Sequence, residues 1–144
     1  MRPICNLRHI SSGGGTSATL TLVGIAEYGS ASGSDKVIIH FDAGAPSGDM
    51  FYIAFNRATG INADTKHYKD LVTIVTQERI TKSHATKSWL KAALGVGGAY
   101  DIPFTSADGY PAKYTVTVNS IDTGSVPARA TVTFYTGVQL PAAP

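Results

Sequence analysis

The feature that most constrains this chain is a regular alternation of apolar and polar residues in "AKYTVTVNSIDTGSVPARATVTFYTG", residues 112–137. Side chains point alternately to the two faces of a β-strand, so this stretch predicts two strands joined by a polar turn. One face of the predicted hairpin forms part of a hydrophobic core. That face carries Tyr114, Val116, Val118, Ala128, Ala130, Val132 and Phe134.

The opposite face of the same hairpin combines cations, hydroxyl groups and one aromatic ring. Cations and hydroxyl donors bind phosphates, and a ring stacks on an unpaired base. The candidate nucleic-acid-binding residues are Lys113, Thr115, Thr117, Arg129, Thr131, Thr133 and Tyr135. Threonine is also a good strand former, so a solvated face explains the pattern as well, and a protein interface is a third alternative.

The remaining segments also favour strands. "MFYIAFNRA" (50–58) is apolar on both faces, which indicates a central strand, and "SHATKSWLKAALG" (83–95) predicts a helix ended by glycine. Residues 18–29, with a bulge near Gly24, and 36–43 are expected to form a hairpin. Further strands are expected in 70–81 and 100–106. We therefore expect a mainly β protein, an antiparallel sheet or β-sandwich of about seven strands with one or two short helices.

The length of 144 residues predicts a single domain, with residues 1–17 as an extended arm. Cys5 is the one cysteine, which excludes a disulfide within the chain and a cysteine-based zinc site. The N-terminus has no apolar run of signal-peptide length, and no stretch approaches the roughly 18 apolar residues of a membrane helix. If Met1 is the native start, folding in the cytoplasm is expected. If a leader was removed, an extracellular location is expected instead.

The charge is unevenly distributed. Residues 66–91 contain six basic and two acidic residues, or +4, whereas the rest of the chain contains six basic and eight acidic residues, or −2. This basic segment is a second candidate for contact with nucleic acid. Its cations are Lys66, Lys69, Arg79, Lys82, Lys87 and Lys91.

No catalytic motif is present: the chain has no GxSxG, HExxH, P-loop or GxGxxG pattern before a helix. None of the four histidines lies at metal-binding spacing from a second ligand. We therefore expect a protein that is not an enzyme and that has no cofactor or metal. The alternative is a small enzyme or a carbohydrate-binding module in which tyrosines or Trp89 supply stacking surfaces for a ligand.

"KYTVTV" and "RATVTF" resemble the paired sheet strands of small RNA-phage coat proteins. In that family the sheet lines the inside of the shell and binds a genomic RNA hairpin. The resemblance implies a self-assembling virion coat or decoration subunit, made in the host cytoplasm, whose partners are further copies of itself and the genome. It implies RNA contacts for Lys113, Thr115, Thr117, Arg129, Thr131 and Thr133.

The segments "IPFT", "AKYTVT" and "TGSVPARATVTFYT" are also similar to the terminal strands of chaperone–usher pilus subunits, including the spacing of Gly124, Ala128, Ala130 and Val132. This second resemblance implies a fimbrial subunit or adhesin at the cell surface. Its incomplete sandwich would be completed by a neighbour's strand, with "SATLTLVGI" as the donor. The coat interpretation is favoured because it requires no export.

Overall fold

The computed structural model describes residues 4–7, 17–42, 50–77, 88–105 and 109–138, with side-chain detail for most of them. These residues form nine strands and two short 3-10 helices. The elements are β1 (Ile4–Leu7), β2 (Ser17–Val23), η1 (Ile25–Ser30), β3 (Ile38–Asp42), β4 (Met50–Phe55), η2 (Gly60–Asn62), β5 (Val72–Gln77), β6 (Ser88–Leu94), β7 (Ala99–Thr105), β8 (Pro111–Asp122) and β9 (Arg129–Val138).

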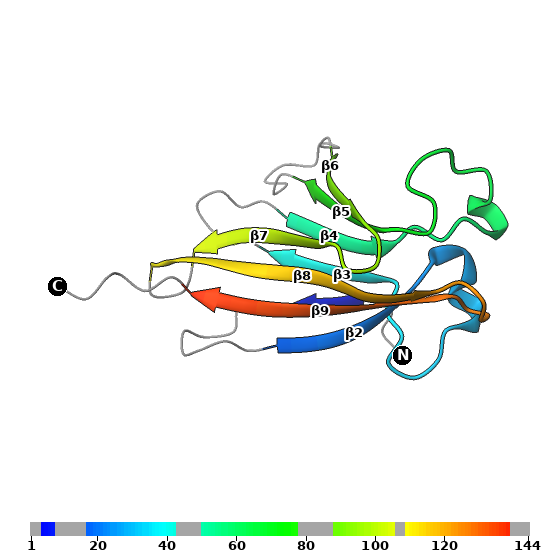
Figure 1. Ribbon diagram of the computed structural model, residues 1–144, viewed down its shortest axis with the longest axis horizontal. Helices are drawn as coiled ribbons and strands as arrows, with labels where there is room; N and C mark the ends of the chain where they lie inside the picture. Colours follow the sequence, from blue (N-terminus) through cyan, green and yellow to red (C-terminus); the bar gives the residue numbers. More distant parts are fainter. Residues whose placement is uncertain (1–3, 8–16, 43–49, 78–87, 106–108, 139–144) are drawn as a thin grey trace, which may run out of the picture.

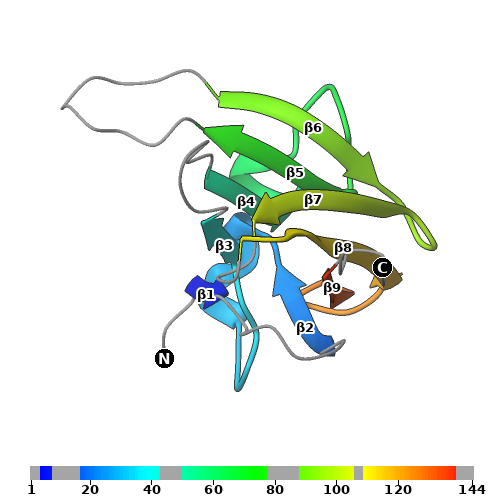
Figure 2. The same ribbon diagram turned by 90° about the vertical axis from the view of Figure 1, so that its left-hand side faces the viewer.

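The strands form a β-sandwich of two sheets, which confirms the predicted mainly β class. The five-stranded sheet has the order β1-β3-β4-β5-β6, and the four-stranded sheet has the order β2-β9-β8-β7. Figures 1 and 2 show the two sheets as facing layers. The β1–β3 pair is parallel and all the other strand pairs are antiparallel.

The core fills the space between the sheets. Tyr114 lies at its aromatic centre, with its ring 4.4 Å from that of Phe41 and 4.8 Å from that of Phe104. Its hydroxyl is buried and has no hydrogen-bond partner in the part of the chain that the structure describes. The other large, fully buried side chains are Leu22, Ile39, Ile53, Ile74, Ile102, Val23, Val72, Val116, Val118 and Val132. Each contributes about 1.5–3 kcal/mol through removal from water.

The hairpin predicted for residues 112–137 is confirmed as β8 and β9. Val116 lies opposite Phe134 and Val118 lies opposite Val132, and the register then shifts at a bulge before Ser120. All seven residues assigned to the inward face are buried. The central position predicted for 50–58 is also confirmed, because β4 is the middle strand of its sheet.

The helix predicted for 83–95 is wrong over its described part. Ser88–Leu94 is instead β6, an edge strand paired with β5, and Lys91 forms a bulge between Leu90 and Ala92. Alanine, leucine and lysine favour helix locally, but the strand hydrogen bonds to β5 and the burial of Leu94 override that propensity. Residues 83–87 lie outside the described residues. The short helices are η1 and η2.

The hairpin predicted for residues 18–43 is also wrong. β2 pairs with β9 in one sheet, whereas β3 pairs with β1 and β4 in the other. The chain leaves β2 at Gly24, where any side chain would collide with Cβ of Arg57, so glycine is needed for this close passage. η1 then carries the chain across from one sheet to the other.

Within the predicted arm, Ile4–Leu7 forms β1, which pairs with β3. The strand predicted at 70–81 is confirmed as β5, Val72–Gln77. No helix in the described part of the chain is long and apolar enough to cross a membrane.

Candidate functional site

The seven residues predicted to bind nucleic acid share the outer face of the four-stranded sheet. Each is exposed or half-buried, and each is flanked along its strand by buried positions. The register brings Thr115 opposite Tyr135 and Thr117 opposite Thr133. The sequence therefore identified correctly which side chains share this surface.

One cation of this face, Lys113, is already paired. Its Nζ lies 3.0 Å from Oδ2 of Asp101 on the neighbouring strand β7, and the hydroxyl of Thr115 donates a 2.7 Å hydrogen bond to Oδ1 of the same carboxylate. The hydrogen bonds from Thr115 and Lys113 lower the pKa of Asp101, so the carboxylate is ionised at neutral pH. Asp101 was not recognised from the sequence, although its alternation with Ile102 in "YDIPF" indicates an outward position.

The other cation, Arg129, is paired at the far end of the same hairpin. Its Nε and Nη2 donate hydrogen bonds of 3.3 and 3.1 Å to the two carboxylate oxygens of Asp35, which is buried. Burial by itself raises the pKa of Asp35. The hydrogen bonds from Arg129 and from the Ser32 backbone N–H outweigh burial, and the pKa is lowered.

Threonine hydroxyls on this face also bond to one another. Thr19 and Thr133 are joined by a 3.1 Å hydrogen bond, and Asn119 donates a 2.6 Å bond to Thr133. Tyr135, 52% exposed, projects from this surface. The described part of the face is therefore hydroxyl-rich, with both of its cations neutralised by carboxylates. Such a surface attracts phosphates weakly.

The predicted basic segment is described at three of its six cations. Lys66 and Lys69 lie in the loop before β5, and Lys91 lies on β6 after it. Arg79, Lys82 and Lys87 lie outside the described residues.

The loop between β4 and β5 is held by a polar network. Asn56 donates hydrogen bonds to the backbone carbonyls of His67 and Tyr68, at 3.2 and 3.0 Å, and its side-chain oxygen accepts one from Asn62. Tyr68 adopts a left-handed backbone conformation, with φ of 58°. A residue other than glycine adopts this conformation at a cost, so the network fixes the position of Tyr68.

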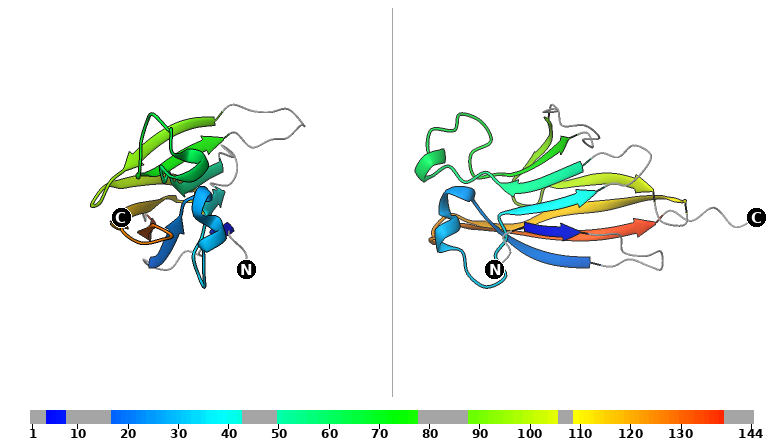
Figure 3. Two further views of the ribbon diagram at one scale, coloured as in Figure 1. Left: turned by 90° about the vertical axis from the view of Figure 1, so that its right-hand side faces the viewer. Right: turned by 180° about the vertical axis from the view of Figure 1, so that it is seen from behind.

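An ion-pair cluster anchors the base of this loop. Arg57 lies 2.9 Å from Asp70 and 3.6 Å from Glu27 of η1. Glu27 also accepts a 3.0 Å hydrogen bond from the Ala128 backbone N–H in the turn before β9. Figure 3 shows η1 and η2 at the same end of the sandwich, where this cluster ties three loops together.

The outer face of the five-stranded sheet is unusually apolar. The side chains that alternate with the buried core residues are Ile38, His40, Met50, Tyr52, Ala54, Thr73, Val75, Gln77, Leu90 and Ala93. None of these ten residues is Asp, Glu, Lys or Arg, and Asp42 and Ser88 occupy the same register positions, opposite Met50 and Gln77. The rings of His40 and Tyr52 lie 5.0 Å apart on this face.

A hollow of about 230 Å³ lies at one end of this apolar face. Ile25 of η1 and Asn62 of η2 border it, and its floor includes Ile38, Ala54 and Thr73. Its lining is predominantly apolar, and its polar groups belong to neutral side chains and backbone. The hollow suits an apolar side chain better than a charged substrate.

The described residues contain no group of three or more histidine, cysteine, aspartate or glutamate side chains that could hold a metal ion.

Comparison with known proteins found no match: no family model, no curated protein and no solved structure matches this chain.

Proposed function

We propose that this chain is a non-enzymatic structural protein that assembles with further copies of itself, as a phage coat or decoration subunit does. The observation that carries the proposal is the apolar outer face of the five-stranded sheet. An antiparallel sheet with one solvated face normally shows polar residues on that face, whereas β4, "MFYIAF", is apolar on both. A sheet with this pattern is stable in water when both of its faces are covered.

Within the described residues, one of these faces is covered by the four-stranded sheet. On the other face, η1 and η2 border one end, around Ile38 and Ala54. Val75 and Tyr52 remain half-buried, and Leu90 remains exposed. Contiguous apolar surface of this kind marks protein–protein contact sites.

A second copy of the chain suits this face because the ten side chains named above include no Asp, Glu, Lys or Arg. Two copies that meet over these ten side chains bring no like charges together, and an isologous contact uses the same surface twice. A stable contact needs roughly 800 Å² from each partner.

The virion role draws support from the coat-like pattern of β8 and β9, which pair with each other as an antiparallel hairpin. The pilus alternative draws less support. The proposed donor segment is β2, and β2 pairs with β9 of its own chain over all seven of its residues. Donation to a neighbour would require β2 to leave that sheet.

The test is the association state of the full chain. Sedimentation velocity over a range of concentrations is expected to show dimers or larger species, and electron microscopy is expected to show closed particles. Protein that stays monomeric at high concentration and forms no particles would refute the proposal.

A further inference from the structure

The described cations differ in whether a carboxylate neutralises them. Arg57, Lys113 and Arg129 are each paired with an acidic side chain. Lys66 and Lys69 are exposed and form no ion pair within the described residues, and the same is true of Lys91. Lys69 does interact electrostatically with the neighbouring Asp70, which is paired with Arg57. Positive charge available to a ligand is therefore found around the β4–β5 loop and β6.

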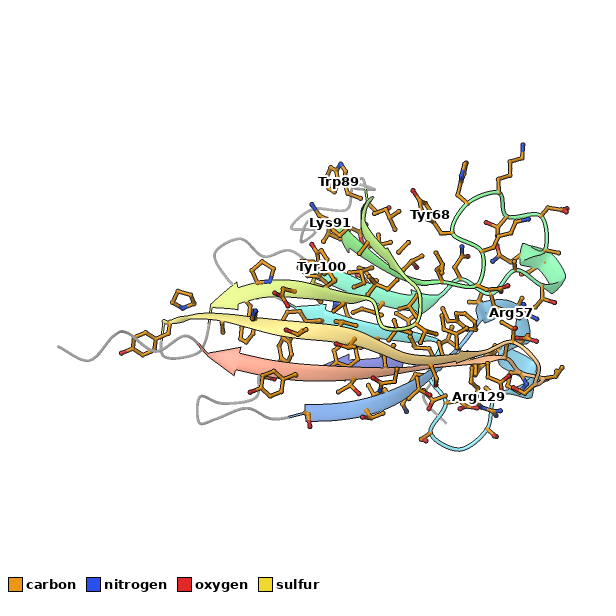
Figure 4. All side chains as sticks on the ribbon, viewed as in Figure 1. Arg57, Tyr68, Trp89, Lys91, Tyr100 and Arg129 are labelled. Carbon is orange, nitrogen blue, oxygen red and sulfur yellow. The ribbon has the colours of Figure 1, made fainter. Side chains whose placement is uncertain are left out.

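Two exposed aromatic side chains accompany these lysines. Tyr68, 50% exposed, lies between Lys66 and Lys69, and Trp89, 44% exposed, is two residues before Lys91. Figure 4 shows Tyr68, Lys91 and Trp89 projecting on the same side of the molecule. We call these five residues, Lys66, Tyr68, Lys69, Trp89 and Lys91, the basic–aromatic edge.

The strand register places this edge along β6. Leu94 at the end of β6 lies opposite Val72, next to the loop that carries Tyr68, and Trp89 lies near the other end, opposite Thr76. Five residues of strand span about 17 Å. Trp89 and Lys91 lie on β6, and Tyr68 lies in the loop that precedes β5.

The loop half of this edge is preorganised. Asn56 holds the carbonyls of His67 and Tyr68, and Asp70, with φ of 55°, accepts a 3.0 Å hydrogen bond from the Ala58 backbone N–H. Backbone strain held in place by such a network is characteristic of functional sites. A loop backbone that is already held in place loses little conformational freedom when the loop binds a ligand.

We propose that the basic–aromatic edge binds single-stranded nucleic acid. Unpaired lysines neutralise phosphates, and exposed rings stack on unpaired bases of a single strand. Duplexes hide their bases in the stack, so they would use the lysines alone. The proposal is independent of self-assembly, since it needs one copy of the chain, and it places the contact away from the outer face of the four-stranded sheet.

The experiment measures binding of a short fluorescein-labelled oligouridylate to the full chain by fluorescence anisotropy at several salt concentrations. Three lysines predict a slope of about −2 in log K against log salt, and Lys66→Gln with Lys69→Gln should reduce it to about −0.7. Tyr68→Ala and Trp89→Ala should each weaken binding about tenfold, whereas Tyr68→Phe should retain it.

Matched controls come from the four-stranded sheet. Lys113→Gln and Tyr135→Ala remove a cation and a ring of similar exposure and should leave binding unchanged. The proposal is overturned if these controls abolish binding while the edge variants bind normally, or if duplex of equal length binds as tightly as the single strand. Loss of binding to phosphatidylserine vesicles in the edge variants, with no oligonucleotide binding by the wild type, would assign the edge to membranes and also overturn it.

Discussion

Arg129 and Asp35 are 94 positions apart in the chain and form an ion pair through two hydrogen bonds. The pair joins the first residue of β9 to the turn that leads into β3, and so connects the two sheets at one end of the sandwich. The Asp35 side chain is 7% exposed and that of Arg129 is 35% exposed, so water screens the pair from one side.

Asp35→Asn should lower the free energy of unfolding by roughly 1–2 kcal/mol at pH 7, because it removes a charged hydrogen-bond acceptor and leaves Arg129 without its partner. Urea unfolding measures this difference. Asp101→Asn is the matched control on an exposed pair that water screens, and it should lower the free energy of unfolding much less than Asp35→Asn does. Equal losses in the two variants would contradict the structural role of Asp35.

The Asp35 ion pair should also make stability depend on pH. The pKa of Asp35 is lowered in the folded state, so its contribution is fully present above the ordinary value of 3.8 and is lost as pH falls through the lowered pKa. The stability difference between the wild type and Asp35→Asn should therefore be constant from pH 7 to about 5 and shrink at lower pH. Urea titrations at several pH values check this, and a difference that grows on acidification would contradict it.

Tyr114→Phe should leave stability unchanged or raise it by up to about 1 kcal/mol. The hydroxyl is buried without a partner in the described residues, and its removal relieves a desolvation cost while the ring contacts with Phe41 and Phe104 remain. Thermal unfolding measures the change. A loss above about 1 kcal/mol would show that the hydroxyl bonds to a group outside the described residues.

Asn56→Ala should loosen the β4–β5 loop. Asn56 makes three side-chain hydrogen bonds there, and their loss should cost roughly 1–2 kcal/mol and speed amide exchange around Tyr68. Hydrogen–deuterium exchange resolved by peptide is the measurement. Asn119→Ala, which removes one exposed bond to Thr133, serves as the control and should leave exchange in this loop unchanged.

The local alternation of apolar and polar residues predicted correctly those strands that have one apolar face and one polar face. β8 and β9 could be placed residue by residue, because their apolar and polar side chains separate with period two. β6 could not, because Trp89, Leu90 and Ala92 lack that period once a bulge intervenes at Lys91. Helix propensity then dominated the sequence prediction, although pairing with β5 determines the conformation.

Pairing between distant strands could not be predicted from the sequence either. β2 and β3 are neighbours in the chain, but they belong to different sheets, and the local pattern carries no information on which sheet a strand joins. For the same reason, the sequence identified which residues share the outer face of the four-stranded sheet, but it did not predict that the two cations of that face are neutralised. Asp101 and Asp35 come from other segments, and their pairing with Lys113 and Arg129 depends on the tertiary fold.

The central claim is that copies of the chain associate through the outer face of the five-stranded sheet. Val75 and Thr117 are both half-buried, outward-facing residues of interior strands, one on each sheet. Replacing each with lysine adds the same charge to opposite outer faces, and neither change should alter stability by more than about 1 kcal/mol.

Sedimentation velocity of the wild type, Val75→Lys and Thr117→Lys at matched concentrations tests this claim most directly. The wild type and Thr117→Lys are expected to sediment as the same assembled species, and Val75→Lys as a folded monomer. Assembly of Val75→Lys at the wild-type concentration, or loss of assembly in Thr117→Lys alone, would contradict the account.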